Sequence, residues 1–265
     1  MCVIIYHQRK HKTIPLEALQ NAIHNNPHGV GLVRFSNKRK LIVTKHLPKD
    51  LINGPNAEAL HKELTQLENH SYILHLRNTT AGENSKENLH PFELYKGTKG
   101  HFVMMHNGTL FDYADKDSKE SDTQRFVEDI AKPLTEMHVN SFPDKCLTSN
   151  PFAMNVLEKY RSAQSRFIVI SGDKRVMRLG TWYEKPFGTC SNDDYFHIVK
   201  RGPHEKKTYY SQNYKQNYNS YGGEDQTNRI YPKLLGAQEA FWKQDFYAGP
   251  PLEETPHIPT SSFFS

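Results

Sequence analysis

The sequence has few cysteines and no long apolar segment, and both shortages limit what the protein can be. Only three cysteines occur in 265 residues, at positions 2, 146 and 190, and no Cys-x-x-Cys pair exists. This excludes a disulfide framework and argues against a zinc site, so we expect reduced thiols, a cytoplasmic location and neither a metal nor a cofactor. No apolar run reaches the length of a membrane span or a signal-peptide core, so we expect a soluble protein without membrane contact.

The sequence also has only a small excess of one charge over the other. The 34 Lys and Arg residues are nearly balanced by 29 Asp and Glu residues, which leaves a formal net charge of +5. This excess is weak support for a polyanionic partner, so we do not expect nucleic acid binding. A hydrophobic content of 36% is compatible with a globular core, but the mean hydropathy of −0.75 indicates that some segment does not pack.

Apolar strands and amphipathic helices alternate along the first 200 residues. The pattern predicts strands at residues 3–6, 29–35, 40–44, 71–76, 102–105, 166–171, 175–179 and 195–199, and helices at residues 15–25, 56–68, 121–130 and 152–163. Ser121 and Gln124 have the spacing of a capping box at the start of one helix. Because no run of strand–helix–strand crossovers is present, a parallel Rossmann-type sheet is not favoured.

The composition changes after about residue 200. Residues 206–226 are rich in Tyr, Asn, Gln and Ser, which predicts a low-complexity segment without a core. Residues 233–243 form a predicted short helix, and a Pro- and Ser-rich tail follows. We therefore predict two parts, a folded domain over residues 1–200 and a low-complexity segment with a short helix and tail over residues 201–265, which docks to a partner protein. Stacking of its tyrosines on single-stranded bases is the alternative.

Cys2 is the first candidate for chemistry. An initiator Met that precedes a residue as small as Cys is readily removed, so the mature chain would begin with a thiol and a free α-amine on one residue. The amine has an ordinary pKa of about 7.7–8.0 and the thiol one of about 8.5. The amine can therefore act as the base that activates its own thiol as a nucleophile.

Four short segments supply groups that suit the cleavage of an amide. They are His75–Gly82 (HLRNTTAG), His90-Pro91-Phe92, Met105–Leu110 (MHNGTL) and Ser121-Asp122-Thr123. Arg77 offers a planar fork for a carboxylate, and Asp122 can pair with an ammonium. The Asn107 side-chain amide and the Gly108 N–H are the two donors that an oxyanion hole needs. A substrate with an α-carboxylate, an α-ammonium and a distal carboxamide is glutamine.

Together with Cys2, these segments resemble the class II glutamine amidotransferases, whose glutaminase domain is an N-terminal-nucleophile hydrolase. The family pattern has a cysteine after the initiator Met, then H-x-R-x-x-T-x-G, H-P, H-N-G and S-D-T segments, and all occur here in order. Residues 180–182 and 188–192 also resemble late strands of that domain. The resemblance covers about the first 200 residues, and it implies an α+β fold with four α/β/β/α layers built on two antiparallel sheets.

The resemblance also implies roles for single residues. Cys2 would attack the carboxamide, Asn107 and Gly108 would hold the oxyanion, and a γ-glutamyl thioester would then be hydrolysed. Arg77 would bind the α-carboxylate and Asp122 the α-ammonium. Thr80 and Gly82 would shape the binding loop. No synthase domain follows, so we expect the ammonia to reach a separate synthase subunit.

Three positions depart from the family pattern. Val3 stands where Gly is frequent, Asn78 replaces a common aromatic residue, and Ala81 matches amidophosphoribosyltransferases rather than glucosamine-6-phosphate synthase. These changes leave the groups that bind glutamine intact but alter the shape of the covering loop. They affect the coupling to an acceptor more than the hydrolysis itself.

Two alternatives remain open from the sequence. The chain could hydrolyse another γ-glutamyl amide, because Arg77 and Asp122 recognise the same head group. It could also be a non-catalytic module that binds nucleic acid or protein, because Asn-Gly is an ordinary turn dipeptide and an Asp in a first helical turn complements the helix dipole. We expect His7 and His11 to be solvated residues of a loop, and Cys146 and Cys190 to be passive thiols.

Overall fold

The structure is a computed structural model, and it describes residues 2–36, 38–47, 57–141, 157, 159, 165–193 and 196. The chain divides into two units, Met1–Lys200 and Arg201–Ser265. The second unit lies outside the described residues, as do Cys146 and most of the helix predicted at 152–163 and the strand predicted at 195–199. The predictions for those parts remain predictions.

Within the described residues, ten strands form two antiparallel sheets. The first has the order β3 (Leu41–His46), β2 (Val30–Phe35), β4 (Tyr72–Leu76), β1 (Val3–His7), β10 (Gly188–Cys190) and β9 (Tyr183–Lys185). The second has the order β5 (Phe92–Gly97), β6 (Gly100–Asn107), β7 (Arg166–Ser171) and β8 (Val176–Leu179). Every strand pairing is antiparallel.

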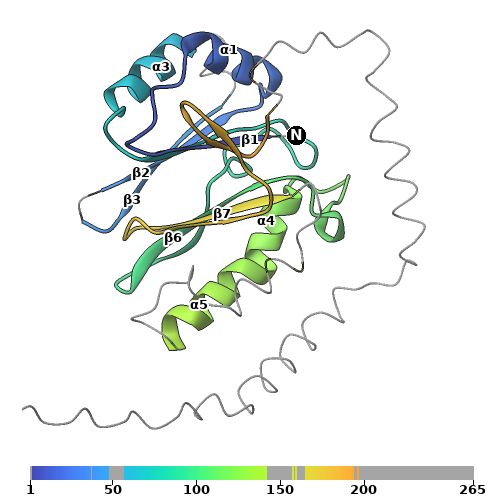
Figure 1. The fold of residues 1–265 in the computed structure, drawn as a ribbon. Helices are drawn as coiled ribbons and strands as arrows, with labels where there is room; N and C mark the ends of the chain where they lie inside the picture. The colour runs from blue at the N-terminus through green and yellow to red at the C-terminus, as the bar shows by residue number, and fades with distance from the viewer. Residues whose placement is uncertain are drawn as a thin grey trace, which may run out of the picture. The chain divides into compact units, whose positions relative to one another are not determined.

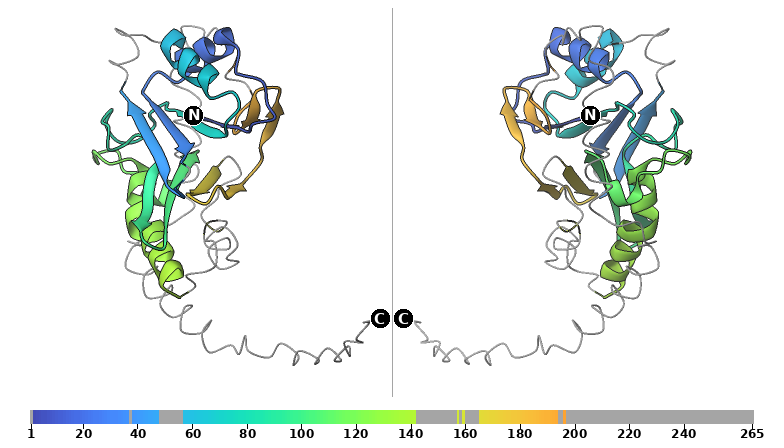
Figure 2. Two further views of the ribbon diagram at one scale, coloured as in Figure 1. Left: turned by 90° about the vertical axis from the view of Figure 1, so that its left-hand side faces the viewer. Right: turned by 90° about the vertical axis from the view of Figure 1, so that its right-hand side faces the viewer.

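Helices cover the outer face of each sheet (Figure 1, Figure 2). The first sheet carries α1 (Leu16–Asn25) and α3 (Ala57–Gln66), and the second carries α4 (Asp122–Phe126) and α5 (Lys132–Ser141). In β1, Val3 and Ile5 pack toward the first pair of helices, whereas Ile4 packs against the second sheet. This period of two produces the four α/β/β/α layers and confirms the predicted fold.

Two differences from the prediction have a local physical cause. The helix predicted to end near residue 130 continues to Ser141, past Pro133. A π-helical turn at Val127–Ala131 precedes it, so Pro133 stands in the first turn of α5, where a missing N–H is tolerated. Strand β5 was not predicted, because a bulge between Glu93 and Tyr95 breaks its alternation. A further point concerns membranes. Among the described residues, no helix is long and apolar enough to cross one.

Candidate active site

Cys2 lies directly before β1, at the edge of the first sheet where β4 ends. Val3 pairs with Leu76, so Cys2 lies beside Arg77 and Asn78. The Asn78 N–H donates to Cys2 Sγ at 3.4 Å. Burial raises the pKa of the Cys2 thiol, although the Asn78 hydrogen bond and the Arg77 charge oppose the shift. The resting thiol is therefore protonated at neutral pH and needs a base before it can act as a nucleophile.

Asn107 ends β6 and is fully buried. Its Nδ2 donates to Ser191 Oγ at 3.0 Å, and the same Oγ accepts from the Ile4 N–H at 2.8 Å. The next residue, Asn192, donates from Nδ2 to the Cys2 carbonyl oxygen. The Ser191-Asn192 pair thus ties the end of β6 to the start of β1 and brings the environments of Asn107 and Cys2 together. The sequence predicts no role for this pair, because Ser-Asn after a short strand is typical of an ordinary turn.

Gly108 follows Asn107 with a φ of +147°. A Cβ at this position would lie 2.5 Å from Ser165 Oγ, so only glycine fits. Residue 108 is half-buried, and it sits at the point where the chain leaves β6. Its backbone can therefore approach a bound molecule without hindrance from a side chain.

Arg77 is 3% exposed and holds the loop that follows it. Its Nη1 donates to the Glu83 carbonyl at 3.0 Å and its Nη2 to the Ala81 carbonyl at 3.2 Å. Burial lowers the pKa of the guanidinium, while the Cys2 and Asp122 groups oppose this shift. Arg77 is therefore a buried cation between the thiol and a carboxylate, and it shapes the loop besides carrying charge.

Asp122 begins α4 and is 5% exposed. Its Oδ2 accepts from the Leu110 N–H at 2.7 Å and its Oδ1 from the Thr123 N–H at 2.8 Å. Burial raises the pKa of the carboxyl, and these hydrogen bonds and Arg77 counteract the rise. The carboxylate is thus fixed in position, with lone pairs left to accept from a bound cation.

The predicted capping box is present only in part. Ser121 Oγ accepts from the Gln124 N–H at 3.1 Å, as a cap should, but the Gln124 side chain contacts Glu120 instead of the Ser121 N–H. That N–H donates to Asn88 Oδ1 at 2.7 Å, and Asn88 Nδ2 donates to the Lys119 carbonyl at 2.7 Å. Asn88 therefore anchors the binding loop to the start of α4.

The loop between β4 and β5 also contains the two predicted loop residues. Thr80 is exposed, whereas Gly82 has a φ of +72° and packs on the backbone at the start of α4. A Cβ at Gly82 would lie 2.6 Å from the Ser121 nitrogen, so a larger residue would push the loop off the helix. Gly82 thereby sets the spacing between Arg77 and Asp122.

Three buried histidines lie behind this site. His75 Nε2 hydrogen bonds to the His106 carbonyl at 3.3 Å, and the rings of His75 and His90 stack at 4.0 Å. Burial lowers the pKa of His75 and of His106 to about 3, and that of His90 well below its ordinary value. All three are therefore neutral at physiological pH. The described residues contain no cluster of three or more His, Cys, Asp or Glu side chains that could hold a metal ion.

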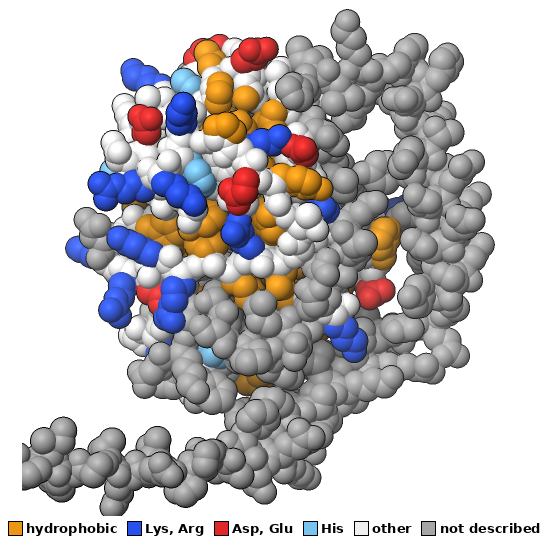
Figure 3. All heavy atoms as spheres, in the orientation of Figure 1, with side chains coloured by type: hydrophobic (Ala, Val, Ile, Leu, Met, Phe, Trp, Pro, Cys, Tyr) orange, Lys and Arg blue, Asp and Glu red, His pale blue; other side chains and the backbone are white. Residues whose placement is uncertain are grey.

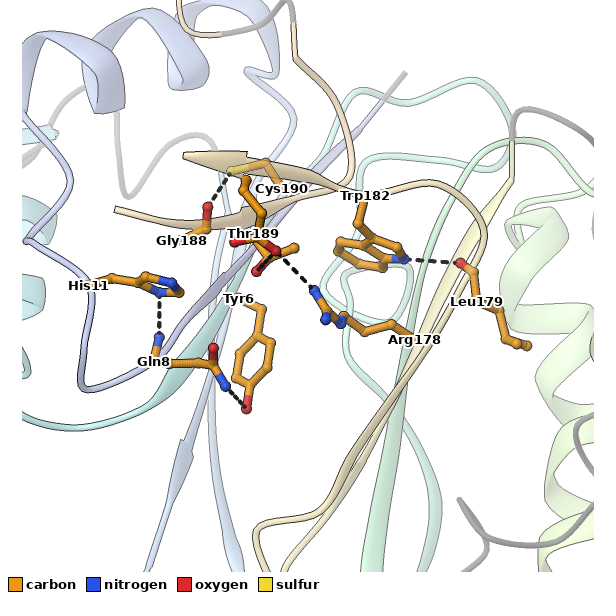
Figure 4. Close-up of polar contacts among 10 residues, drawn as sticks. Tyr6, Gln8, His11, Arg178, Leu179, Trp182, Gly188, Thr189 and Cys190 are labelled. Carbon is orange, nitrogen blue, oxygen red and sulfur yellow. Dashed lines mark hydrogen bonds and ion pairs between the residues drawn. The ribbon is translucent and has the colours of Figure 1, made fainter. Parts of the chain in front are cut away.

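His7 is not solvated as predicted. Its ring is fully buried, stacks on Tyr72 at 4.4 Å and has its nitrogens 3.1 Å from the Phe187 and Glu68 carbonyls. The prediction was wrong because β1 extends through His7. The ring is therefore buried between the β9–β10 turn and the residues that follow α3. His11 is half-buried and its Nδ1 accepts from the Gln8 N–H at 3.0 Å (Figure 4).

The edge of the sandwich near β8 and β9 contains side chains that no motif indicated. The Arg178 guanidinium lies 6.0 Å from the Tyr6 ring and 5.8 Å from the Trp182 ring (Figure 4). Cys190 is buried nearby and faces the Gly188 carbonyl, and burial raises the pKa of its thiol to about 12. Trp182 packs against the core between the two sheets, whereas Cys190 belongs to the core between the first sheet and its helices, and its thiol is too weakly acidic to react.

The family model described as "Glutamine amidotransferases class-II" matches residues 10–127. This stretch of the chain is therefore similar to a class-II glutamine amidotransferase domain. The match includes Arg77, Thr80, Gly82, Asn107, Gly108 and Asp122, but it begins after Cys2. No curated protein matches the chain.

Two solved structures are similar to this chain. One is a glutamine phosphoribosylpyrophosphate amidotransferase from B. subtilis complexed with ADP and GMP, with 17% identity, a TM-score of 0.33, and coverage of 65% of this chain and 35% of that chain. The other is titled as the allosteric regulatory enzyme of purine biosynthesis, with 17% identity, a TM-score of 0.32, and coverage of 65% and 36%. The chain thus spans about a third of the length of these two structures.

Proposed function

We propose that this chain hydrolyses glutamine to glutamate and ammonia through a thioester on Cys2, and that the ammonia passes to a separate acceptor enzyme. One observation carries the proposal. The Cys2 thiol, the buried Arg77 guanidinium and the buried Asp122 carboxyl interact electrostatically with one another, and Ser191-Asn192 ties the buried Asn107 amide to the start of β1.

The reaction needs a base, because burial raises the pKa of the Cys2 thiol. The free α-amine of Cys2, once the preceding residue is removed, takes the thiol proton, and Sγ then attacks the carboxamide carbon. The Asn107 side-chain N–H and the Gly108 main-chain N–H stabilise the oxyanion. Collapse breaks the C–N bond, the amine returns its proton to the leaving nitrogen, and ammonia departs. Water hydrolyses the remaining thioester and releases glutamate.

Substrate recognition follows from the two buried charges. Arg77 pairs with the α-carboxylate of glutamine and Asp122 with its α-ammonium. Both protein charges are fixed by hydrogen bonds to backbone groups, so little ordering is needed on binding. Thr80 and Gly82 shape the loop that covers the substrate.

The first test is a comparison of substrates. We expect the protein to release ammonia and glutamate from glutamine, and its kcat/KM for glutamine to exceed that for γ-glutamyl amides of larger amines. The measurement is steady-state kinetics with each amide, with glutamate as the common product. A large preference for bulkier leaving groups would support the γ-glutamyl amide hydrolase instead, and no turnover of any of these amides would support a non-catalytic module.

Ser191 offers a second test, because it holds the Asn107 amide by a hydrogen bond but takes no part in the proposed chemistry itself. We expect Ser191→Ala to lower kcat for glutamine about ten- to a hundredfold with a smaller effect on KM, less than the loss of an oxyanion donor itself. Ser191→Thr keeps the hydroxyl and should retain more activity. Equal losses in both variants, or a change confined to KM, would contradict the positioning role.

A further inference from the structure

The end of the sandwich opposite Cys2 is formed by the turns that join β2 to β3, β5 to β6 and β7 to β8 (Figure 1). Because Asn107 ends β6 and Cys2 precedes β1, these turns lie a full strand length from the candidate active site. Seven exposed cations lie in these turns or at the strand end beside them. We call this surface the basic end, and it consists of Lys38, Arg39, Lys40, Lys96, Lys99, Lys174 and Arg175.

The three turns are packed together as one surface. The Leu41 N–H donates to His101 Nδ1 at 3.0 Å, and the Gly172 N–H donates to the His101 carbonyl at 2.8 Å. A Cβ at Gly172 would lie 2.2 Å from the Arg39 carbonyl oxygen. The turn of the first sheet therefore rests directly on the turns of the second, and the cations have fixed relative positions.

Few acids neutralise this charge. Glu93 lies 3.9 Å from Lys96, and Asp173 pairs with Arg175. Within the part of the chain that the structure describes, no carboxylate lies within ion-pair distance of Lys38, Arg39, Lys40 or Lys174. Lys and Arg side chains gather on the side of the molecule where these turns lie (Figure 3). The modest net charge of the whole sequence does not reveal this local concentration of positive charge.

The backbone of two of the cations is unusual. Arg39 has a φ of +53° and Lys174 one of +73°, and they are the two non-glycine residues with positive φ among those described. Glycine, Asn or Asp ordinarily fills such positions, because a larger side chain is strained there. Both strained positions lie in the basic end and both carry a cation. A strained residue at a surface turn points to a function of its side chain.

We propose that the basic end binds the phosphate backbone of a nucleic acid duplex. Four cations of the basic end, Lys38, Arg39, Lys40 and Lys174, have no carboxylate within ion-pair distance among the described residues, and such a group of cations suits a repeating array of phosphates. The described residues of the three turns carry no exposed aromatic or aliphatic side chain, and the exposed Ile42 and Val43 of the adjoining β3 are successive strand residues that point to opposite faces. Stacking on unpaired bases needs aromatic side chains, and a protein interface needs a continuous apolar centre, so a duplex fits better than a single strand or an acidic protein. The binding is independent of sequence and sensitive to salt.

The test uses the full chain, a fluorescent DNA duplex of random sequence and a salt titration. The informative variant is Arg39→Gly/Lys174→Gly, because glycine adopts the left-handed backbone freely and removes both charges. We expect the variant to keep or raise the wild-type Tm, to bind about tenfold more weakly at low salt, and to lower the slope of log Kd against log salt by about two. Glutaminase activity should not change, since the basic end is remote from Cys2.

The matched control is Lys62→Ala/Lys86→Ala, which removes two exposed lysines outside the basic end. It should retain the wild-type affinity and slope. An equal loss in this control would show that only net charge matters and would overturn the site. Absence of duplex binding at low salt would overturn the proposal, and so would tighter binding to poly-glutamate than to the duplex, which would indicate an acidic protein partner.

Discussion

Cys2→Ala protein should release no measurable ammonia from glutamine. The thiol is the nucleophile that attacks the carboxamide in the proposed reaction, and removal of a catalytic nucleophile typically costs about 10⁵–10⁶ in rate. Cys2→Ser should retain at most a trace, because a hydroxyl is a poorer nucleophile at neutral pH. Both variants keep Arg77 and Asp122, so they should still bind glutamine, which calorimetry or a glutamine-dependent rise in Tm can measure.

Cys190 provides the matched control for this experiment. It is a buried cysteine in the same sheet, its Sγ faces the Gly188 carbonyl, and burial raises the pKa of its thiol to about 12. Cys190→Ala should therefore keep the wild-type kcat with a modest loss of stability from the small cavity. Intact-mass spectrometry of the active protein completes the test. Activity in a protein whose Cys2 nitrogen is still part of a peptide bond would exclude the α-amine as the base.

The layered fold could be predicted because its signals are local. Strand β1 and the β2–β3 and β7–β8 hairpins have clear apolar runs, and α1 and α3 have apolar residues at helical spacing. The position of the site could be predicted for a related reason: its side chains follow strand ends or open a helix. The family resemblance supplied what periodicity cannot, namely that both sheets are antiparallel and packed face to face.

The residues that hold the site could not be predicted. Asn88, Ser191 and Asn192 are polar residues of loops, and nothing local distinguishes them from solvated turn residues. Their roles depend on partners about 30 to 190 positions away in the sequence. Arg77 was predicted to bind a substrate carboxylate, yet its guanidinium also fixes the loop backbone at Ala81 and Glu83. Such contacts exist only after the chain has folded.

The buried histidines should make the folded protein less stable in acid. In the unfolded chain a histidine has a pKa of about 6.5, whereas in the folded chain the pKa of His75 and that of His106 fall to about 3. Below pH 6.5 the unfolded state therefore binds more protons than the folded state. The free energy of unfolding should be nearly constant above that pH and fall below it, by up to about 1.4 kcal/mol per pH unit for each histidine. Asp122 opposes this trend near pH 4, because burial raises the pKa of its carboxyl.

His90→Phe isolates one member of the group. Both ring nitrogens of His90 lack a hydrogen-bond partner among the described residues, and the ring stacks on His75 and meets Phe92 edge-on, so a phenyl ring can occupy the same space. The variant should be at least as stable as the wild type at pH 7, because two buried polar atoms without protein partners are removed. Urea unfolding between pH 7 and 4.5 should give a slope of the free energy of unfolding against pH about 1.4 kcal/mol per pH unit shallower than that of the wild type.

His70→Gln is the control, since the His70 side chain is exposed and its ring meets water in both states. A wild-type stability that stays constant down to pH 4.5 would mean that the interior accommodates the added protons, and the account of a neutral histidine group behind the active site would fail.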